Sequence, residues 1–254
     1  MKLTILGSGS AFIAANRAAT GMLLEIKKDI ILIDCGYGVS LRLKQAGHDP
    51  LDLTPILITH THTDHFSDLI ALLWSRNWGQ SGNIQIIGPQ GLTAFFNKLQ
   101  KIMIPGVVKR AKWNLKIEEA NNRTIKFKKW YLGSFVLPTT QPFSLIKKEI
   151  AYKISTNNKS FAYTGDTNPN DFNNKLIKFL YKIDVLMIEC STPKKSNEHL
   201  WPEMCGKIAQ KIQPKKLILT HISPEVEKIN IKKIASKYYK GQIIIAKDLM
   251  QIKI

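Results

Sequence analysis

Four side chains that can bind a metal lie within six consecutive residues, His60-Thr61-His62-Thr63-Asp64-His65. The apolar run Ile56-Leu57-Ile58 just before them is typical of a buried strand, so the cluster stands at a strand end. His60 and His62 are two positions apart, and an extended backbone points such residues to the same side. Imidazole nitrogens and carboxylate oxygens are ligands of zinc and similar cations. A loop of hydrogen-bonded polar residues is the alternative, but it suits a lone histidine better, and we expect a metal site.

The length and composition favour one domain. A chain of 254 residues with 44% apolar content can bury one large core. The sequence contains no Pro/Gly/Ser-rich linker, repeat or low-complexity tract, and its polar motifs recur from residue 7 to residue 221. We therefore expect a single domain that covers residues 1–254.

Hydrophobic periodicity predicts alternating strands and helices. The predicted strands are residues 20–26, 30–34, 55–59, 84–87, 149–154, 160–164, 184–189 and 216–220, with further β segments between residues 114 and 140. The predicted helices are residues 39–46, 66–75, 92–102, 171–181, 202–212 and 226–239. Periodicity alone supports a mixed α/β fold and leaves the stacking of its layers open.

The cysteines and the apolar runs predict a cytoplasmic protein with no membrane association. Cys35, Cys190 and Cys205 are odd in number and widely spaced, which favours reduced thiols over a disulfide framework. The segment Met1–Gly7 reaches a glycine too early for the core of a signal peptide. No apolar run reaches the ~18 residues of a membrane span.

The formal net charge of +18 is compatible with an acidic partner such as RNA. The segments Lys109–Trp113 and Lys126–Tyr131 interleave cations with aromatic residues, as a path for a single strand does. Two alternatives stay open. The excess of Lys, Ile and Asn is what an AT-rich genome imposes without selection for binding, and lysines also protect exposed β edges.

The motifs of the chain, taken in order, resemble the metallo-β-lactamase superfamily. They are Leu3–Ser10, Ile31–Gly36, the H-x-H-x-D-H cluster, Tyr163–Thr167 and Leu219–His221. The closest resemblance is to the ribonuclease Z-like and related phosphodiesterase branch, and it spans nearly the whole chain. It implies a four-layer αββα sandwich in which two sheets are flanked by helices.

The resemblance also implies two metals in one pocket at an edge of the sandwich. The matching ligands are His60 and His62 for the first metal, Asp64, His65 and His221 for the second, and Asp166 for both. One or two zinc ions are implied, with manganese or iron as alternatives. Taken alone, Asp166 could be a turn residue and His221 a surface residue.

One ligand of that family is missing from the sequence. The family usually supplies a further histidine to the first metal, but no histidine stands between His65 and His199. Gln141 is the best candidate for the position. Its amide oxygen suits harder metals than zinc, so we expect the first site to be the weaker one, or to hold manganese, iron or nothing.

His199 and Asp64 are the candidate catalytic residues. Ribonuclease Z-like proteins carry a histidine near the position of His199 that protonates the leaving oxygen, and an unperturbed pKa of ~6.5 suits that role. The alternative is a solvated histidine before a helix. Asp64 would orient the water nucleophile, and Asp34 would support the loop beneath the metals.

The resemblance therefore predicts a metal-dependent phosphodiesterase that uses a metal-activated water on RNA or on a small phosphodiester. The segment Thr167–Asp184 is too short for the arm with which that family clamps transfer RNA. A lactonase, esterase or sulfatase of the same fold is an alternative, because the substrate is set by the pocket and not by the fold. A weakened binding protein and a homodimer also stay open.

Overall fold

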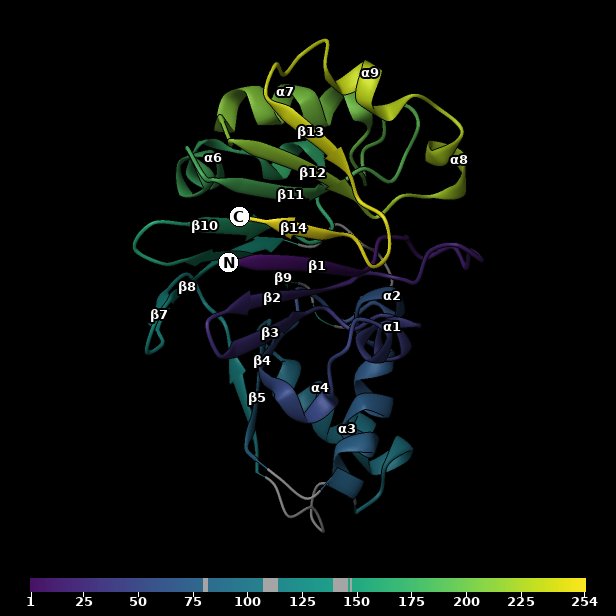
Figure 1. The fold of residues 1–254 in the computed structure, drawn as a ribbon, viewed down its shortest axis with the longest axis vertical. Coiled ribbons are helices and arrows are strands. Elements are labelled where there is room, and N and C mark those ends of the chain that lie inside the picture. Colours follow the sequence, from purple (N-terminus) through teal and green to yellow (C-terminus); the bar gives the residue numbers. More distant parts are fainter. Residues whose placement is uncertain (80–81, 107–113, 139–145, 147) are drawn as a thin grey trace.

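The computed structural model describes residues 1–79, 82–106, 114–138, 146 and 148–254, and it contains two seven-stranded sheets stacked face to face (Figure 1). The first sheet has the order β14 (Gln251–Lys253), β1 (Lys2–Gly7), β2 (Gly21–Ile26), β3 (Asp29–Ile33), β4 (Leu53–Leu57), β5 (Ile84–Gly88) and β6 (Leu115–Glu119). The second has the order β13 (Gln242–Ile245), β12 (Lys216–Thr220), β11 (Val185–Glu189), β10 (Ser160–Tyr163), β9 (Lys148–Ser155), β8 (Tyr131–Pro138) and β7 (Thr124–Lys126).

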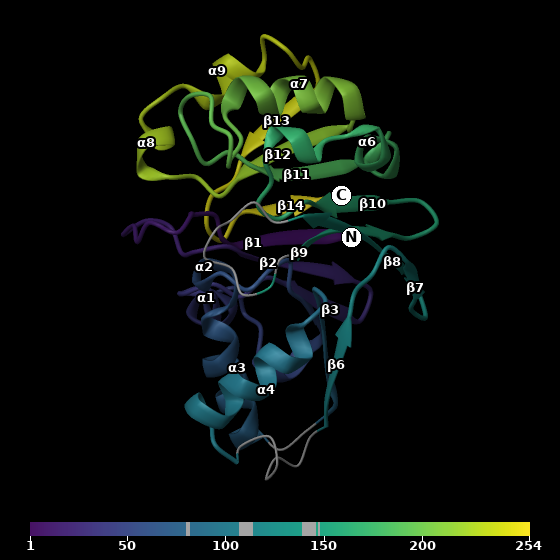
Figure 2. The same ribbon diagram turned by 180° about the vertical axis from the view of Figure 1, so that it is seen from behind.

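Helices cover the outer faces of both sheets, as the two opposite views show (Figures 1 and 2). Those on the side of the first sheet are α1 (Val39–Gln45), α2 (Thr63–Phe66), α3 (Asp68–Gly79) and α4 (Leu92–Met103). Those on the side of the second sheet are α6 (Asn174–Leu180), α7 (Pro202–Ile212), α8 (Pro224–Glu227) and α9 (Ile231–Ala235). The order of layers is thus helix, sheet, sheet, helix.

Most strands are apolar on both faces, because each sheet packs against the other sheet on one face and against helices on the other. In β2, Met22 and Leu24 face the core between the sheets, whereas Leu23 faces the helices. In β11, Met187 faces the core between the sheets and Leu186 faces the helices on the other side. This alternation divides the buried apolar residues into three clusters, one between each pair of layers.

The parallel strands of both sheets end at one edge of the sandwich. Strands β3, β4 and β5 are parallel neighbours in the first sheet, and β10, β11 and β12 are parallel neighbours in the second. Loops that follow parallel strands meet at the carboxyl ends of those strands. The loops after β4, β10 and β12, which carry the predicted ligands, therefore share this edge.

The structure confirms the predicted α/β class, and most predicted elements lie within a few residues of the observed ones. The predicted helix at 226–239 is wrong, because two short helices, α8 and α9, occupy this region. Strands β13 and β14 were not predicted. None of the described helices is long and apolar enough to cross a lipid bilayer. The assignment of residues 1–254 to one domain stays a prediction.

Candidate metal centre

A loop and one helical turn after β4 position the residues of the histidine motif. The backbone is still extended at His62, with ψ of 151°, before α2 begins. The turn of α2 then directs Asp64 and His65 into the protein, where both are buried. Gly36 allows this path, because a Cβ atom there would lie 1.9 Å from the carbonyl oxygen of Asp64.

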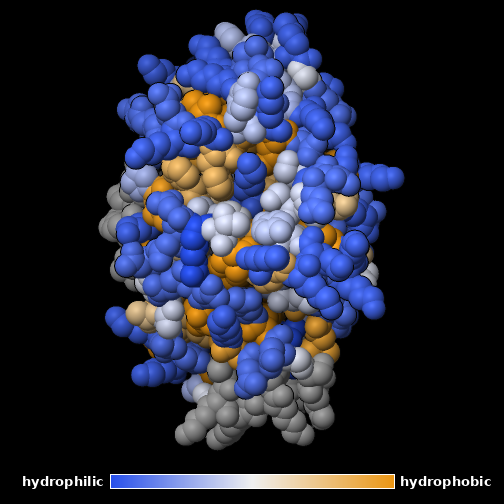
Figure 3. All heavy atoms as spheres, turned by 90° about the vertical axis from the view of Figure 1, so that its left-hand side faces the viewer, coloured by the Kyte–Doolittle hydropathy of each residue, from blue (hydrophilic) through white to orange (hydrophobic). Residues whose placement is uncertain are grey.

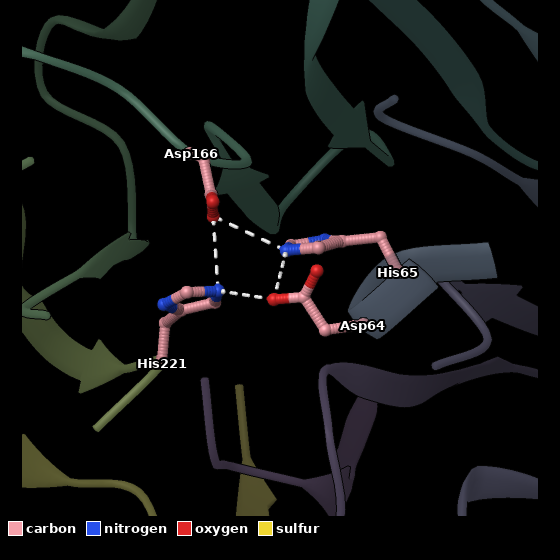
Figure 4. Close-up of side chains that lie close together, drawn as sticks. All are labelled: Asp64, His65, Asp166 and His221. Carbon is pink, nitrogen blue, oxygen red and sulfur yellow. Dashed lines mark hydrogen bonds and ion pairs between the residues drawn. The ribbon is translucent and has the colours of Figure 1, made fainter. Parts of the chain in front are cut away.

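Asp64 and His65 of α2 converge with Asp166 and His221, which come from two other segments, and the four form what we call the four-ligand site (Figure 4). His221 Nε2 lies 3.1 Å from Asp64 Oδ2 and 3.3 Å from Asp166 Oδ1. His65 Nε2 lies 3.2 Å from the same Asp166 oxygen and 3.7 Å from Asp64 Oδ2. All four side chains are buried, and they point toward one another.

His60, His62 and Asp166 form a neighbouring group, the three-ligand site. His60 Nε2 lies 3.1 Å from His62 Nδ1 and 3.9 Å from Asp166 Oδ2. Asp166 is therefore shared, with Oδ1 directed to the four-ligand site and Oδ2 to the three-ligand site. A carboxylate in this position can bind two cations at once.

The chemistry of both groups fits divalent cations. Among the described residues, His62 Nε2, His65 Nε2 and Asp166 Oδ1 are buried polar atoms without a hydrogen-bond partner, and a buried atom of this kind costs roughly 1–3 kcal/mol. A tetrahedral cation with bonds of ~2.0–2.1 Å holds its ligand atoms ~3.3 Å apart. The closest separations in the four-ligand site are 3.1, 3.2 and 3.3 Å.

Asp34 fixes the orientation of His65 from below the site. Its carboxylate accepts hydrogen bonds of 2.8 Å from the Thr59 N–H and of 2.8 Å from the Thr59 hydroxyl. Asp34 Oδ2 also lies 2.8 Å from His65 Nδ1. With its Nδ1 proton directed to this carboxylate, His65 presents Nε2 to a metal, which is how carboxylates support metal-binding histidines.

A second buried carboxylate, Glu189, supports the opposite side of the site. The Ser191 hydroxyl donates to Glu189 and lies 2.7 Å from His221 Nδ1. Glu189 also accepts a hydrogen bond of 2.9 Å from the Thr167 N–H, next to Asp166. It thus helps to place ligands on two different loops.

His199 pairs with Glu189 and is held in its charged form. Its Nδ1 lies 3.0 and 3.1 Å from the two carboxylate oxygens of Glu189. Burial lowers the pKa of His199, but the Glu189 carboxylate outweighs burial and raises that pKa to about 10. The His199 ring also stacks against the His221 ring, with centroids 6.1 Å apart. The solvated histidine considered above is therefore not what the structure contains.

Burial and neighbouring charges set the protonation of Asp166 and His60. Burial raises the pKa of Asp166, but His221 and His65 outweigh it and hold that pKa well below its usual range. Burial lowers the pKa of His60 well below its usual value, so this imidazole is neutral near pH 7. A neutral imidazole and an ionised carboxylate are the forms that bind metals.

The structure brings all six predicted ligands together, and it places His199 beside them through Glu189. Gln141 lies outside the described residues, as does the segment 109–113. His48 lies elsewhere, 3.7 Å from Glu25. Sequence reasoning missed Glu189. An acidic residue that closes the buried apolar run Val185–Ile188 was the available signal, because such a residue needs a partner.

Comparison with known proteins gives a match over most of the chain. Residues 1–244 match the protein family described as "Anti-Pycsar protein Apyc1". A ribonuclease Z of Mycobacterium sp. (strain KMS) is 39% identical over 94 residues, which are 36% of this chain and 33% of that relative. This chain thus matches about a third of the length of that curated relative. The probable metallo-hydrolase YhfI of Bacillus subtilis (strain 168) is 27% identical over 259 residues, 98% of both chains.

Solved structures show the same fold. The metallo-β-lactamase fold protein YhfI from Bacillus subtilis has a TM-score of 0.82 at 22% identity, covering 99% of this chain and 98% of that one. The short form of human tRNase Z has a TM-score of 0.80 at 22% identity, covering 100% and 99%. The predicted four-layer fold and the resemblance to the metallo-β-lactamase superfamily are confirmed.

Proposed function

The chain belongs to the family of the anti-Pycsar protein Apyc1, and from this premise we propose that it is a metal-dependent phosphodiesterase of the ribonuclease Z-like type that hydrolyses a small phosphodiester. The observation that carries the proposal is the carboxylate of Asp166, which is shared between two groups of ligands, with the Glu189–His199 pair beside them. Metal ligands supply a site for the nucleophile, and the pair supplies an acid for the leaving group.

The four-ligand site would hold the tighter metal and the three-ligand site the weaker one. We propose zinc for the four-ligand site, because its imidazoles and carboxylates are ligands that zinc accepts. A divalent cation there supplies positive charge that lowers the pKa of a water nucleophile and neutralises charge on the phosphoryl oxygens. Asp64 would accept a hydrogen bond from that water and so orient it.

His199 would donate the proton that the leaving oxygen needs. Its Nδ1 is directed to Glu189, so Nε2 is the nitrogen from which it would donate. A pKa of about 10 keeps the ring protonated at neutral pH, when an acid is required. The Glu189 carboxylate holds the ring in one orientation and stabilises its charge.

The region after Asp166 favours a small substrate over transfer RNA. Residues Thr167–Asp184 form a 3-10 turn at Pro169–Asp171 and the short helix α6, with no projecting arm. Leu176 and Leu180 of α6 are buried against the second sheet. RNA is the second candidate substrate, but residues 167–184 provide no arm that could clamp it.

The proposal is tested by turnover of bis(p-nitrophenyl) phosphate beside p-nitrophenyl acetate, with zinc or manganese added. We expect hydrolysis of the phosphodiester and little of the carboxylic ester. The substitution His199→Ala should keep the metal content and lower kcat by roughly 10²–10⁴-fold, the usual contribution of a general acid. The matched control is His48→Ala, which removes a histidine outside the site. Preference for the ester, or an unchanged kcat in His199→Ala, would refute the assignment.

A further inference from the structure

Three hairpin turns meet at the edge of the sandwich opposite the metal centre, on the left side of Figure 1. They join β2 to β3, β7 to β8, and β9 to β10. The turns enclose a hollow of about 700 Å³ that is open to solvent, which we call the turn groove. Strand β1, of six residues, spans roughly 20 Å at ~3.3 Å per residue, so the groove is separate from the metal centre.

The groove is lined by cations and not by acids. Its lysines are Lys27, Lys126, Lys128, Lys129 and Lys159. No aspartate or glutamate is among its described lining residues. The lysine ion pairs in the described part of the chain all involve other lysines, so none of these five charges is neutralised by a carboxylate. Five uncompensated cations from three turns attract polyanions.

Aromatic rings form part of the same groove. Phe127 and Trp130 stack in parallel, with centroids 3.9 Å apart and 4° between their planes. Trp130 Nε1 donates a hydrogen bond of 2.9 Å to Asp29 Oδ2, which ties the second sheet to the first at this point. Tyr131 next to them is 39% exposed. Trp130 itself is buried, so Tyr131 is the ring on which a nucleic-acid base could stack. Asn157 and Asn158 add hydrogen-bonding groups.

Protection of a β edge explains only a part of this pattern. Strand β7 is the last strand of its sheet, so Lys126 does lie on an exposed edge. Lys128 and Lys129 belong to the turn beyond β7, and Lys27 and Lys159 belong to turns of other strand pairs. Charges on those turns do not prevent another strand from pairing with β7, so protection of this edge does not account for them.

We propose that the turn groove binds single-stranded nucleic acid, with phosphates against the lysines and a base against Tyr131. A bilayer is flat and takes up apolar groups that project into it, whereas this site is hollow. Figure 3 shows the same face, where hydrophilic side chains predominate and lie between several separate apolar patches. A narrow, flexible polyanion with flat bases matches such a surface, and the proposed hydrolysis of a small phosphodiester does not require it.

The test is the fluorescence anisotropy of a 5′-labelled oligo(dT) of 12 nucleotides, titrated at several KCl concentrations. Single strands give a slope of log K against log salt of about −0.7 per neutralised phosphate, so five lysines allow a slope no steeper than about −3.5. The double substitution Lys128→Glu and Lys129→Glu should weaken binding at least tenfold and flatten the slope by about 1.4. Tyr131→Ala should weaken binding at least fivefold, through the loss of ~1–3 kcal/mol of base stacking.

The matched control is Lys98→Glu with Lys101→Glu, which changes the net charge equally on exposed positions of α4. It should leave affinity within about twofold of the unaltered protein, and both double variants should keep their hydrolysis of bis(p-nitrophenyl) phosphate. An equal loss in the control would assign binding to net charge and overturn the proposal. Absence of oligo(dT) binding would also overturn it, as would groove-dependent binding of phosphatidylserine vesicles in its place.

Discussion

The substitution Asp34→Asn should weaken metal binding at the four-ligand site while leaving the fold intact. Asparagine has nearly the volume of aspartate, so the buried space behind His65 stays filled. The Asp34 carboxylate has three hydrogen-bond contacts, from the Thr59 N–H, the Thr59 hydroxyl and His65 Nδ1. An amide cannot accept all three hydrogen bonds, because its NH₂ end is a donor. If its oxygen accepts from the Thr59 N–H, its nitrogen faces His65 Nδ1, which lies 2.8 Å away in the unaltered protein.

The size of the effect follows from the tautomer of His65. A donor opposite Nδ1 requires Nδ1 to be the acceptor, so the proton moves to Nε2, the atom that faces the metal site. The reverse orientation of the amide sets its N–H groups against the Thr59 N–H. Loss of a supporting carboxylate typically lowers metal affinity by 10–100-fold, which is about 1.4–2.8 kcal/mol.

Competition for zinc with a chromogenic chelator measures this affinity, and circular dichroism of the metal-free proteins measures their thermal unfolding. The matched control is Asp184→Asn. Asp184 accepts 2.8 and 2.9 Å hydrogen bonds from the N–H and hydroxyl of Ser160, as Asp34 does from Thr59, but at the far end of the strands. Unaltered zinc affinity in Asp34→Asn would refute the reasoning. Unfolding of the metal-free variant would show a structural role instead.

Three further outcomes are expected. Asp166→Ala should remove metal from both sites, because its two oxygens face different ligand groups; undiminished metal in elemental analysis would contradict this. Zinc titration should give one tight and one loose event, because only His60, His62 and Asp166 form the three-ligand site among the described residues; two equally tight events would reveal another ligand. Because Glu189 raises the pKa of His199 to about 10, kcat should not fall until about pH 10. Glu189→Gln removes the carboxylate that raises this pKa, so the fall in kcat should move to lower pH. An identical pH profile in the variant would count against the role of the Glu189–His199 pair.

The ligands could be predicted from the sequence because each is marked by its immediate neighbours along the chain. Four of them stand in one short motif, and Asp166 and His221 each follow an apolar strand, where a polar residue is conspicuous. Glu189 was missed because its partner His199 comes from another segment, and no spacing rule connects the two. Such a pair is set by the packing of β11 against the loop before α7.

The errors in the fold have the same origin. Periodicity over residues 226–239 is helical, but Asn230 caps a new helix and its side chain accepts from the Lys233 N–H, which interrupts the run. Strand β14 has only three residues and pairs with β1, at the other end of the sequence. A short strand whose partner is that remote carries little pattern of its own.

The placement of the ligands on both sheets makes a bound cation a cross-link. His65 follows a strand of the first sheet and His221 a strand of the second, so a metal held by both closes a loop of roughly 150 residues. The chain-entropy treatment of cross-links assigns about 5 kcal/mol to a loop of that length. The two halves of the sandwich would then separate less readily when metal is bound. A lack of metal would therefore lower both the catalytic activity of the protein and the time for which it stays folded.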